Sequence, residues 1–233
     1  MRVVIFGASG MLGQGVLREC LRASDVEQVV TIVRVPSGAS DPKLVELVHT
    51  DLLDYRAIES TLSGLDACYF CLGVSSAGLD EAQYTRITYD IALAAARTLA
   101  RLNPQMTFIY VSGQGTDATE QGRIMWARVK GRTENALRAL PFKAVYAFRP
   151  GFIQPLHGAR SRTRAYRMTY LILAPVMPLL RALFPNQVLT TEVIAQAMLN
   201  ITRHGARQAI LGSRQINAAA TSPGRTARLD AAS

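Results

Sequence analysis

The feature that most constrains the fold of this chain is a glycine-rich turn close to its N-terminus. Residues 3–6 form a short apolar run that predicts a buried strand, and residues 11–23 carry apolar side chains at helical spacing. A strand, a glycine turn and a helix in this order predict the opening unit of a parallel α/β sheet. The turn itself consists of Gly7, Ala8, Ser9, Gly10, Met11, Leu12 and Gly13.

The glycines of this turn predict a dinucleotide site. Gly7 permits a tight turn, Gly10 lets the backbone approach a pyrophosphate, and Gly13 allows the helix to pack closely on the sheet. Backbone amides at the start of the helix and its positive dipole end favour a bound anion. The alternative is a structural turn that holds no ligand. The predicted contacts of the dinucleotide in the turn are Gly7, Ser9, Gly10, Met11, Leu12 and Gly13.

The end of the second predicted strand, over residues 28–34, favours NADP(H) over NAD(H). NAD-specific sites usually carry Asp or Glu about 20 residues beyond the glycine motif, where the carboxylate binds the ribose 2′-hydroxyl. Here that position is Arg34, and the next acidic residue is Asp41. A guanidinium pairs with a 2′-phosphate, whereas a carboxylate repels it. The alternative is that Arg34 is a solvated charge at a strand end. Asp51 and Leu52 follow the third strand and are expected beside the adenine.

The predicted fold class is α/β: a Rossmann-type, doubly wound, mostly parallel sheet with helices on both faces. A length of 233 residues suits one domain, which we assign to residues 1–212. Residues 213–233 are rich in small side chains and arginine with little periodicity, and they predict a flexible tail. The further strands are predicted over 44–49, 67–72, 106–112 and 143–148, and the helices over 54–62, 81–101 and 124–140.

Cysteine usage and the N-terminus predict a cytoplasmic protein. Three cysteines are too few for a disulfide framework. Cys68 and Cys71 have the spacing of a redox motif, but within a strand this spacing places them on opposite faces as buried residues. The apolar run before Gly7 is too short for a secretory signal. No metal site is predicted, because no Cys, Asp or Glu stands in ligand spacing with His49, His157 or His204.

The net charge of +9 is concentrated in one part of the chain. No Asp or Glu occurs between Glu134 and Glu192. We interpret residues 152–187 as a basic and apolar insert on the substrate side of the fold. The arginines of residues 160–167 either bind a phosphate or carboxylate of the substrate or form a solvated face. The positive charges of this stretch are Arg138, Lys143, Arg149, Arg160, Arg162, Arg164, Arg167 and Arg181.

Within this insert, residues 168–184 are mostly apolar. Two prolines and Arg181 interrupt the run, so a membrane span is not predicted. A broken helix that covers a pocket is favoured over contact of residues 157–184 with a membrane surface. Nucleic acid is not predicted as a partner, because only Tyr166 and Tyr170 stand near the arginines as stacking residues.

Several further motifs follow the glycine turn in a defined order within residues 1–212. They are Asp51-Leu52, Gly73, Val111-Ser112, Lys130, Arg149-Pro150-Gly151, Pro185-Asn186, and Thr190-Thr191 before a helix that ends at Ala197-Met198. In this order the chain resembles small, atypical, epimerase-like members of the short-chain dehydrogenase/reductase superfamily. The resemblance implies that Leu72, Gly73, Lys130 and Pro150 contact the cofactor.

The chain departs from this superfamily in its catalytic pair. The family uses a tyrosine and a lysine four residues apart on one helix face, with a Ser or Thr after the fifth strand. The lysine lowers the pKa of the tyrosine, which exchanges a proton with a carbonyl or an alcohol. Here the lysine is Lys130, but the tyrosine position is Trp126, whose indole cannot act as an acid or a base. Ser112 stands at the end of the fifth strand, where the family has a serine, and Gln114 is the alternative occupant of the catalytic hydroxyl position. The catalytic candidates are therefore Ser112 and Lys130.

These observations leave two main hypotheses. The first is an NADP(H)-dependent oxidoreductase on a small molecule, in which water, Tyr166 or Tyr170 replaces the missing phenol. The second is a non-catalytic NADP(H)-sensing protein that acts through a partner or a membrane surface. An isomerase or dehydratase of nucleotide sugars ranks last, because those enzymes also need the tyrosine and a larger C-terminal domain.

Overall fold

A seven-stranded sheet forms the centre of the computed structural model, which describes residues 1–156 and 188–221. The strand order is β3-β2-β1-β4-β5-β6-β9, and every neighbouring pair is parallel. A separate parallel pair is formed by β7 (Phe152–Gln154) and β8 (Val188–Thr190). The α/β class is thereby confirmed. The strands of the main sheet are β1 (Arg2–Phe6), β2 (Gln28–Val33), β3 (Leu44–Val48), β4 (Ala67–Phe70), β5 (Thr107–Val111), β6 (Ala144–Arg149) and β9 (Ile210–Gly212).

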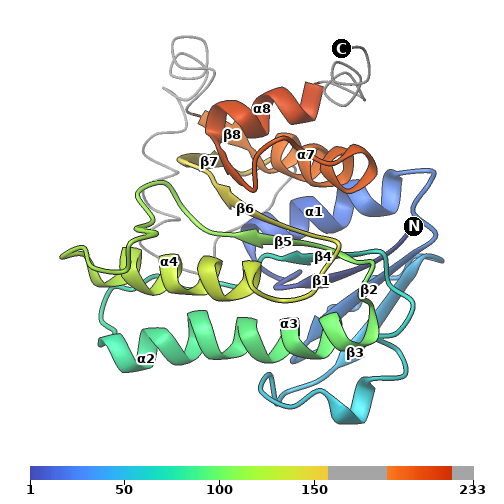
Figure 1. Ribbon diagram of the computed structural model, residues 1–233. Helices are drawn as coiled ribbons and strands as arrows, with labels where there is room; N and C mark the ends of the chain where they lie inside the picture. The colour runs from blue at the N-terminus through green and yellow to red at the C-terminus, as the bar shows by residue number, and fades with distance from the viewer. Residues whose placement is uncertain (157–187, 222–233) are drawn as a thin grey trace.

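Helices cover both faces of this sheet (Figure 1). Successive side chains of β1 enter two separate apolar cores, Val3 and Ile5 on one face and Val4 and Phe6 on the other. Both faces are buried, and the strands are therefore continuously apolar rather than alternating. One layer contains α1 (Met11–Arg22), α7 (Thr191–His204) and α8 (Ser213–Thr221), and the other contains α2 (Glu81–Thr85), α3 (Ile91–Leu102) and α4 (Met125–Arg138).

The order of the strands reverses between β1 and β4. From β1 the chain moves outward to β2 and β3, and then it returns to β4 on the other side of β1. The Cys71 amide donates to the Phe6 carbonyl at 2.9 Å, so the two strands stay paired to their carboxyl ends. In open α/β sheets, ligands bind outside the carboxyl ends of the strands at such a reversal. The glycine turn after Phe6 lies at this point.

Two predicted helices differ from those observed. Residues 54–62 contain only a 3₁₀ turn at Arg56–Ile58, followed by further turns. Ser60 and Thr61 have low helix propensity, and Gly64, with a φ of +70°, ends the segment. The helix predicted over residues 81–101 consists of α2 and α3 joined by a π-helical turn at Arg86–Asp90.

The C-terminal region is more regular than predicted. Residues 213–221, part of the predicted flexible tail, form α8 because Ile216 is fully buried in the core that α7 also enters. One buried isoleucine among alanines produces little periodicity, and the sequence therefore did not indicate this helix. Strand β9, at the edge of the sheet, also escaped prediction because it has only three residues. Residues 222–233 lie outside the described part of the chain.

Cys68 and Cys71 lie on opposite faces of the sheet as predicted, but only Cys68 is fully buried and Cys71 is half-buried. Cys68 belongs to the core on the α3 side of the sheet, and Cys71 packs against the core on the α1 side. Cys20, Cys68 and Cys71 are all free thiols.

Candidate functional site

The turn after β1 brings three backbone segments into close contact. Gly7 has a φ of +79°, and a Cβ at this position would lie 2.7 Å from the Leu72 amide nitrogen. A Cβ at Gly13 would lie 2.1 Å from the Gly7 carbonyl oxygen. That carbonyl accepts a hydrogen bond from the Gly10 amide at 2.9 Å, which closes the turn. Positions 7 and 13 therefore require glycine for steric reasons.

The start of α1 is open to a ligand. Gly10 is the N-cap residue, no side chain caps the helix, and its first turn contains no acidic residue. The first amides of a helix have no partner within the helix, so they bind anions. Next to the turn, the space where a Cβ of Gly73 would stand is empty. Ser9 is exposed and Met11 half-buried, whereas the Leu12 side chain lies in the core and only its backbone can reach a ligand. This geometry fits the pyrophosphate of a dinucleotide.

Arg34 lies beside the glycine turn. Phe6 pairs with Ile32 in the β1–β2 register, so Arg34 is level with residue 8, one strand away. Its side chain is exposed, and among the described residues its guanidinium has no carboxylate partner. Beyond β3, Asp51 is exposed and Leu52 is half-buried. The two sides of the glycine turn are thus occupied by Arg34 and by Leu72.

Lys130 contacts the carboxyl end of β5. Its Nζ donates to the Val111 carbonyl oxygen at 3.3 Å and lies 5.2 Å from the centre of the Tyr110 ring. Burial lowers the pKa of Lys130 to about 8, although the nearby Glu134 carboxylate acts in the opposite direction. The amine can therefore gain or lose a proton close to neutral pH.

Ser112 is buried and bonded to a second hydroxyl. Its Oγ lies 2.9 Å from the Thr116 Oγ1, which itself donates to the Gly113 carbonyl at 2.8 Å. The Ser112 proton is therefore directed at Thr116, and the Ser112 oxygen is left as an acceptor. Gln114, the other candidate for this position, is exposed. Sequence reasoning missed Thr116, although two hydroxyl residues four apart around a glycine loop were visible in the sequence.

Trp126 occupies the position of the family's tyrosine at the start of α4. Its indole is half-buried against the loop that follows β5. The indole Cη2 lies 3.5 Å from the position of a Cβ at Gly115, and Cζ3 lies 4.0 Å from that at Gly113. The indole therefore contacts the loop that begins at Ser112. It shapes this loop, but its N–H is too weakly acidic to act in proton transfer.

A buried ion pair, which sequence reasoning missed, lies beside Lys130. Glu134 is 1% exposed, and its carboxylate accepts hydrogen bonds from Arg149 Nε at 3.0 and 3.2 Å and from Nη2 at 2.6 Å. This carboxylate neutralises Arg149, which is one of the positive charges of the basic stretch between Glu134 and Glu192. The visible signal was that Glu134 follows Lys130 by one helical turn.

A cavity of about 500 Å³ opens at the carboxyl ends of β5, β6 and β9. Gln114, Arg149 and Ser213 are among the residues that line it. The Gln114 amide donates to the carbonyl of Pro150, which is buried, at 3.0 Å. The Gly151 amide donates to the Ser213 hydroxyl at 2.9 Å. The loops after three strands and the start of α8 thus line one open cavity, and Gln114 in its wall is two residues from Ser112.

Of residues 152–187, which we interpret as a substrate-side insert, the structure describes residues 152–156. Residues 157–187 lie outside the described part of the chain, and with them the arginines of residues 160–167, Tyr166 and Tyr170. Over residues 1–156 and 188–221, no helix is both long enough and apolar enough to span a bilayer.

Comparison with known proteins identifies relatives of this chain. A family model described as NAD(P)H-binding matches residues 7–177. The chain is 28% identical over 169 residues to "Protein fmp52, mitochondrial" of Emericella nidulans, which covers 70% of each chain. It is 30% identical over 169 residues to "Protein FMP52, mitochondrial" of Saccharomyces cerevisiae, which covers 70% of this chain and 69% of that protein.

Two solved structures share this fold. The UDP-N-acetylglucosamine 4-epimerase from Methanobrevibacter ruminantium M1 superposes with a TM-score of 0.67 at 15% identity, covering 91% of this chain and 75% of that chain. The Bordetella bronchiseptica enzyme WbmF, solved in complex with NAD+, superposes with a TM-score of 0.65 at 15% identity, covering 94% and 76%. At these identities the similarity establishes the fold.

These relatives overturn one prediction and confirm another. The cytoplasmic location is contradicted, because the curated relatives are named as mitochondrial proteins. The rule behind that prediction tests for a secretory leader and does not separate the cytoplasm from other compartments. The resemblance to atypical short-chain dehydrogenases/reductases is confirmed by the family match and by the fold. The chain belongs to the NAD(P)H-binding family.

Proposed function

We propose that this chain is an NADP(H)-dependent oxidoreductase that acts on a small molecule in the cavity beside Arg149. The observation that carries the proposal is the row formed by the carboxyl ends of β2, β1, β4 and β5, which are neighbours in the sheet. Arg34 follows β2 at one end of this row, and Lys130 donates to Val111 of β5 at the other end. Four neighbouring strands, β2, β1, β4 and β5, span about 14 Å at the usual spacing of roughly 4.8 Å. That distance suits an extended dinucleotide whose pyrophosphate lies on the glycine turn in the middle of the row.

The preference for NADP(H) rests on the charge beside the turn. Arg34 is exposed at the strand end where NAD-specific sites carry a carboxylate. The acidic residue nearest to it in the loop that follows is Asp41. An exposed guanidinium at this position forms paired, charge-assisted hydrogen bonds with a 2′-phosphate. We therefore expect Arg34 to hold the phosphate, with Asp51 and Leu52 beside the adenine.

The reaction that we propose is hydride transfer with a proton supplied by the protein. The bound nicotinamide supplies or accepts the hydride. Lys130 holds a proton at neutral pH because its pKa is about 8, and we expect it to deliver this proton to a substrate oxygen through an ordered water. We expect Ser112 to accept a hydrogen bond only from a donor group of the substrate, such as the hydroxyl of an alcohol, since its own proton is directed at Thr116. This arrangement replaces the phenol that Trp126 lacks.

Calorimetric titration with NADPH and NADH tests the cofactor half of the proposal. We expect tighter binding of NADPH, and a loss of about 10- to 100-fold in its affinity on Arg34→Ala, because a hydrogen bond to a charged group contributes roughly 1.5–3 kcal/mol. Binding of NADH should change less than about twofold, because NADH has no 2′-phosphate for Arg34 to bind. Arg97→Ala, an exposed arginine on α3, is the matched control. Equal affinity of the wild type for both cofactors contradicts the role of Arg34.

A second candidate function is a non-catalytic sensor of NADP(H), and Trp126 is the observation that favours it. Oxidation of NADPH with a panel of aldehydes, ketones and quinones separates the two functions. Turnover by the wild type that is lost in Lys130→Met supports the oxidoreductase. Turnover that arises only in Trp126→Tyr supports the sensor, because only the proton donor was then missing. No turnover by either protein counts against oxidoreductase activity.

A further inference from the structure

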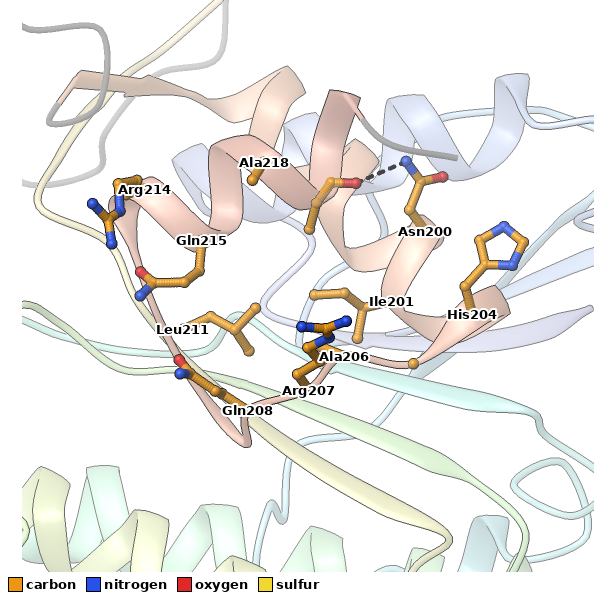
Figure 2. A pocket seen from close by; sticks show the side chains of 12 residues that line it. Asn200, Ile201, His204, Ala206, Arg207, Gln208, Leu211, Arg214, Gln215 and Ala218 are labelled. Carbon is orange, nitrogen blue, oxygen red and sulfur yellow. Dashed lines mark hydrogen bonds between the residues drawn. The ribbon is translucent and has the colours of Figure 1, made fainter. Parts of the chain in front are cut away.

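A second pocket lies between α7, α8 and β9 (Figure 2), and no residue of the glycine turn lines it. Its volume is about 330 Å³. Pockets for small organic ligands occupy roughly 300–1,000 Å³, so this pocket is large enough for a compact molecule. The glycine turn, Ser112 and Lys130 do not line it, and it shares only Arg214 and Gln215 with the cavity beside Arg149.

The inner wall of this pocket is apolar. Ile201 on α7 is 2% exposed and Leu211 on β9 is 3% exposed, and both side chains face the pocket (Figure 2). Ala206, Ala218 and Ala219 extend this wall on the loop after α7 and on α8. Small side chains on α8 leave the space open, because a larger residue at any of these positions would fill it. A ligand would therefore bury an apolar body here.

Hydrogen bonds hold the walls of the pocket in place. The Asn200 Nδ2 on α7 donates to the Ala219 carbonyl at 3.0 Å and to the Ala220 carbonyl at 3.2 Å, which fixes the end of α8 over the pocket. The Ala206 amide donates to the Tyr146 hydroxyl at 3.0 Å, which ties the loop after α7 to β6. The pocket is thus formed before any ligand arrives, and binding requires little ordering of the protein.

The rim of the pocket is cationic. Arg207 and Arg214 are exposed and line its edge, and none of the described lining residues is an aspartate or glutamate. Gln208 and Gln215 add amide groups to the same edge (Figure 2). Guanidinium groups around an apolar wall attract a ligand with a carboxylate or sulfonate at one end.

We propose that this pocket binds a compact apolar molecule that carries a single acidic group. The apolar body lies against Ile201 and Leu211, and the acidic group lies at the rim beside Arg207 and Arg214. An acyl-chain acid and an aromatic acid share this chemistry. No residue of the glycine turn contributes to this pocket, whereas Arg214 and Gln215 also line the cavity beside Arg149.

Two fluorescent probes that differ in one charge test the proposal. 8-Anilinonaphthalene-1-sulfonate is anionic, and N-phenyl-1-naphthylamine lacks its sulfonate. Both are titrated into the full chain with saturating NADP+, which blocks the dinucleotide site without fluorescing itself. Ala218→Phe should weaken both probes at least about tenfold, because the added ring occupies the apolar space. The matched control is Ala139→Phe, an exposed alanine at the end of α4 in the other helix layer.

The charge of the rim is tested separately. The double variant Arg207→Gln/Arg214→Gln should weaken the anionic probe about tenfold and leave the neutral probe within about twofold. Arg97→Gln/Arg138→Gln, with two exposed arginines in the other layer, controls for net charge.

Competition by decanoate or by 1-naphthoate distinguishes an acyl-chain acid from an aromatic acid. Equal weakening of both probes by the rim variant, displacement by neither acid, or wild-type affinity in Ala218→Phe overturns the proposal. NADPH calorimetry on each variant reports separately on the dinucleotide site.

Discussion

Replacing Glu134 by leucine should destabilise the protein more than any change at a surface ion pair. Among the ion pairs of the described residues, Glu134 has the most buried carboxylate, at 1% side-chain exposure. It accepts three hydrogen bonds of 2.6–3.2 Å from Arg149. Leucine has a similar volume, so the substitution removes the charge without opening a large cavity. Arg149 is then left largely buried without a counter-charge.

The expected loss follows from the burial of the two partners. Removing one partner of a buried ion pair costs roughly 3–5 kcal/mol of unfolding free energy. The Arg149 side chain is 19% exposed, so water can reach part of its guanidinium. We therefore expect the lower end of the range, about 3 kcal/mol. For a protein of this size, that loss corresponds to a fall of roughly 6–12 °C in melting temperature.

Urea unfolding followed by circular dichroism measures this loss, and a second substitution tests its cause. Glu134→Leu/Arg149→Met removes both charges, so its stability should return to within about 1 kcal/mol of the wild type. The control is Glu59→Leu, which breaks the more exposed pair with Arg101 and should cost less than about 1 kcal/mol. A loss in Glu134→Leu as small as that in the control would falsify the reasoning. A double variant less stable than both single variants would refute it equally.

Three further predictions follow from single sites. Gly13→Ala should lower the free energy of unfolding by more than about 2 kcal/mol, because the added Cβ would lie 2.1 Å from the Gly7 carbonyl oxygen. Gly73→Ala is the control and should keep the wild-type melting temperature, because the space around its Cβ is empty. The rate of NADPH-linked reduction should fall as the pH rises above the Lys130 pKa of about 8, because only the protonated amine donates; a profile flat to pH 10 argues against this role. Burial raises the pKa of Cys71 to about 12 and also those of Cys20 and Cys68, so a thiol reagent at pH 8 should react fully only in urea; fast labelling of the folded protein contradicts this burial.

Local patterns in the sequence were sufficient for the central fold and the cofactor turn. Strand β1, the glycine turn and α1 are consecutive in the chain, so their interactions are encoded within about 20 residues. A buried strand or a long helix has an apolar pattern that can be recognised from its own residues alone. The π-helical turn at Arg86–Asp90 and the short 3₁₀ turn at Arg56–Ile58 lie outside such patterns.

The sequence by itself determined that the chain presents a glycine turn between a strand and a helix, with an arginine at the end of the next strand. Only the tertiary structure decided which side chains from separate elements meet. Glu134 meets Arg149 because α4 packs on β6. The second pocket exists because α7, β9 and α8 meet at one edge of the sheet, with Ile216 of α8 buried in the shared core. Such contacts depend on the packing of separate elements, and no periodicity within one segment encodes them.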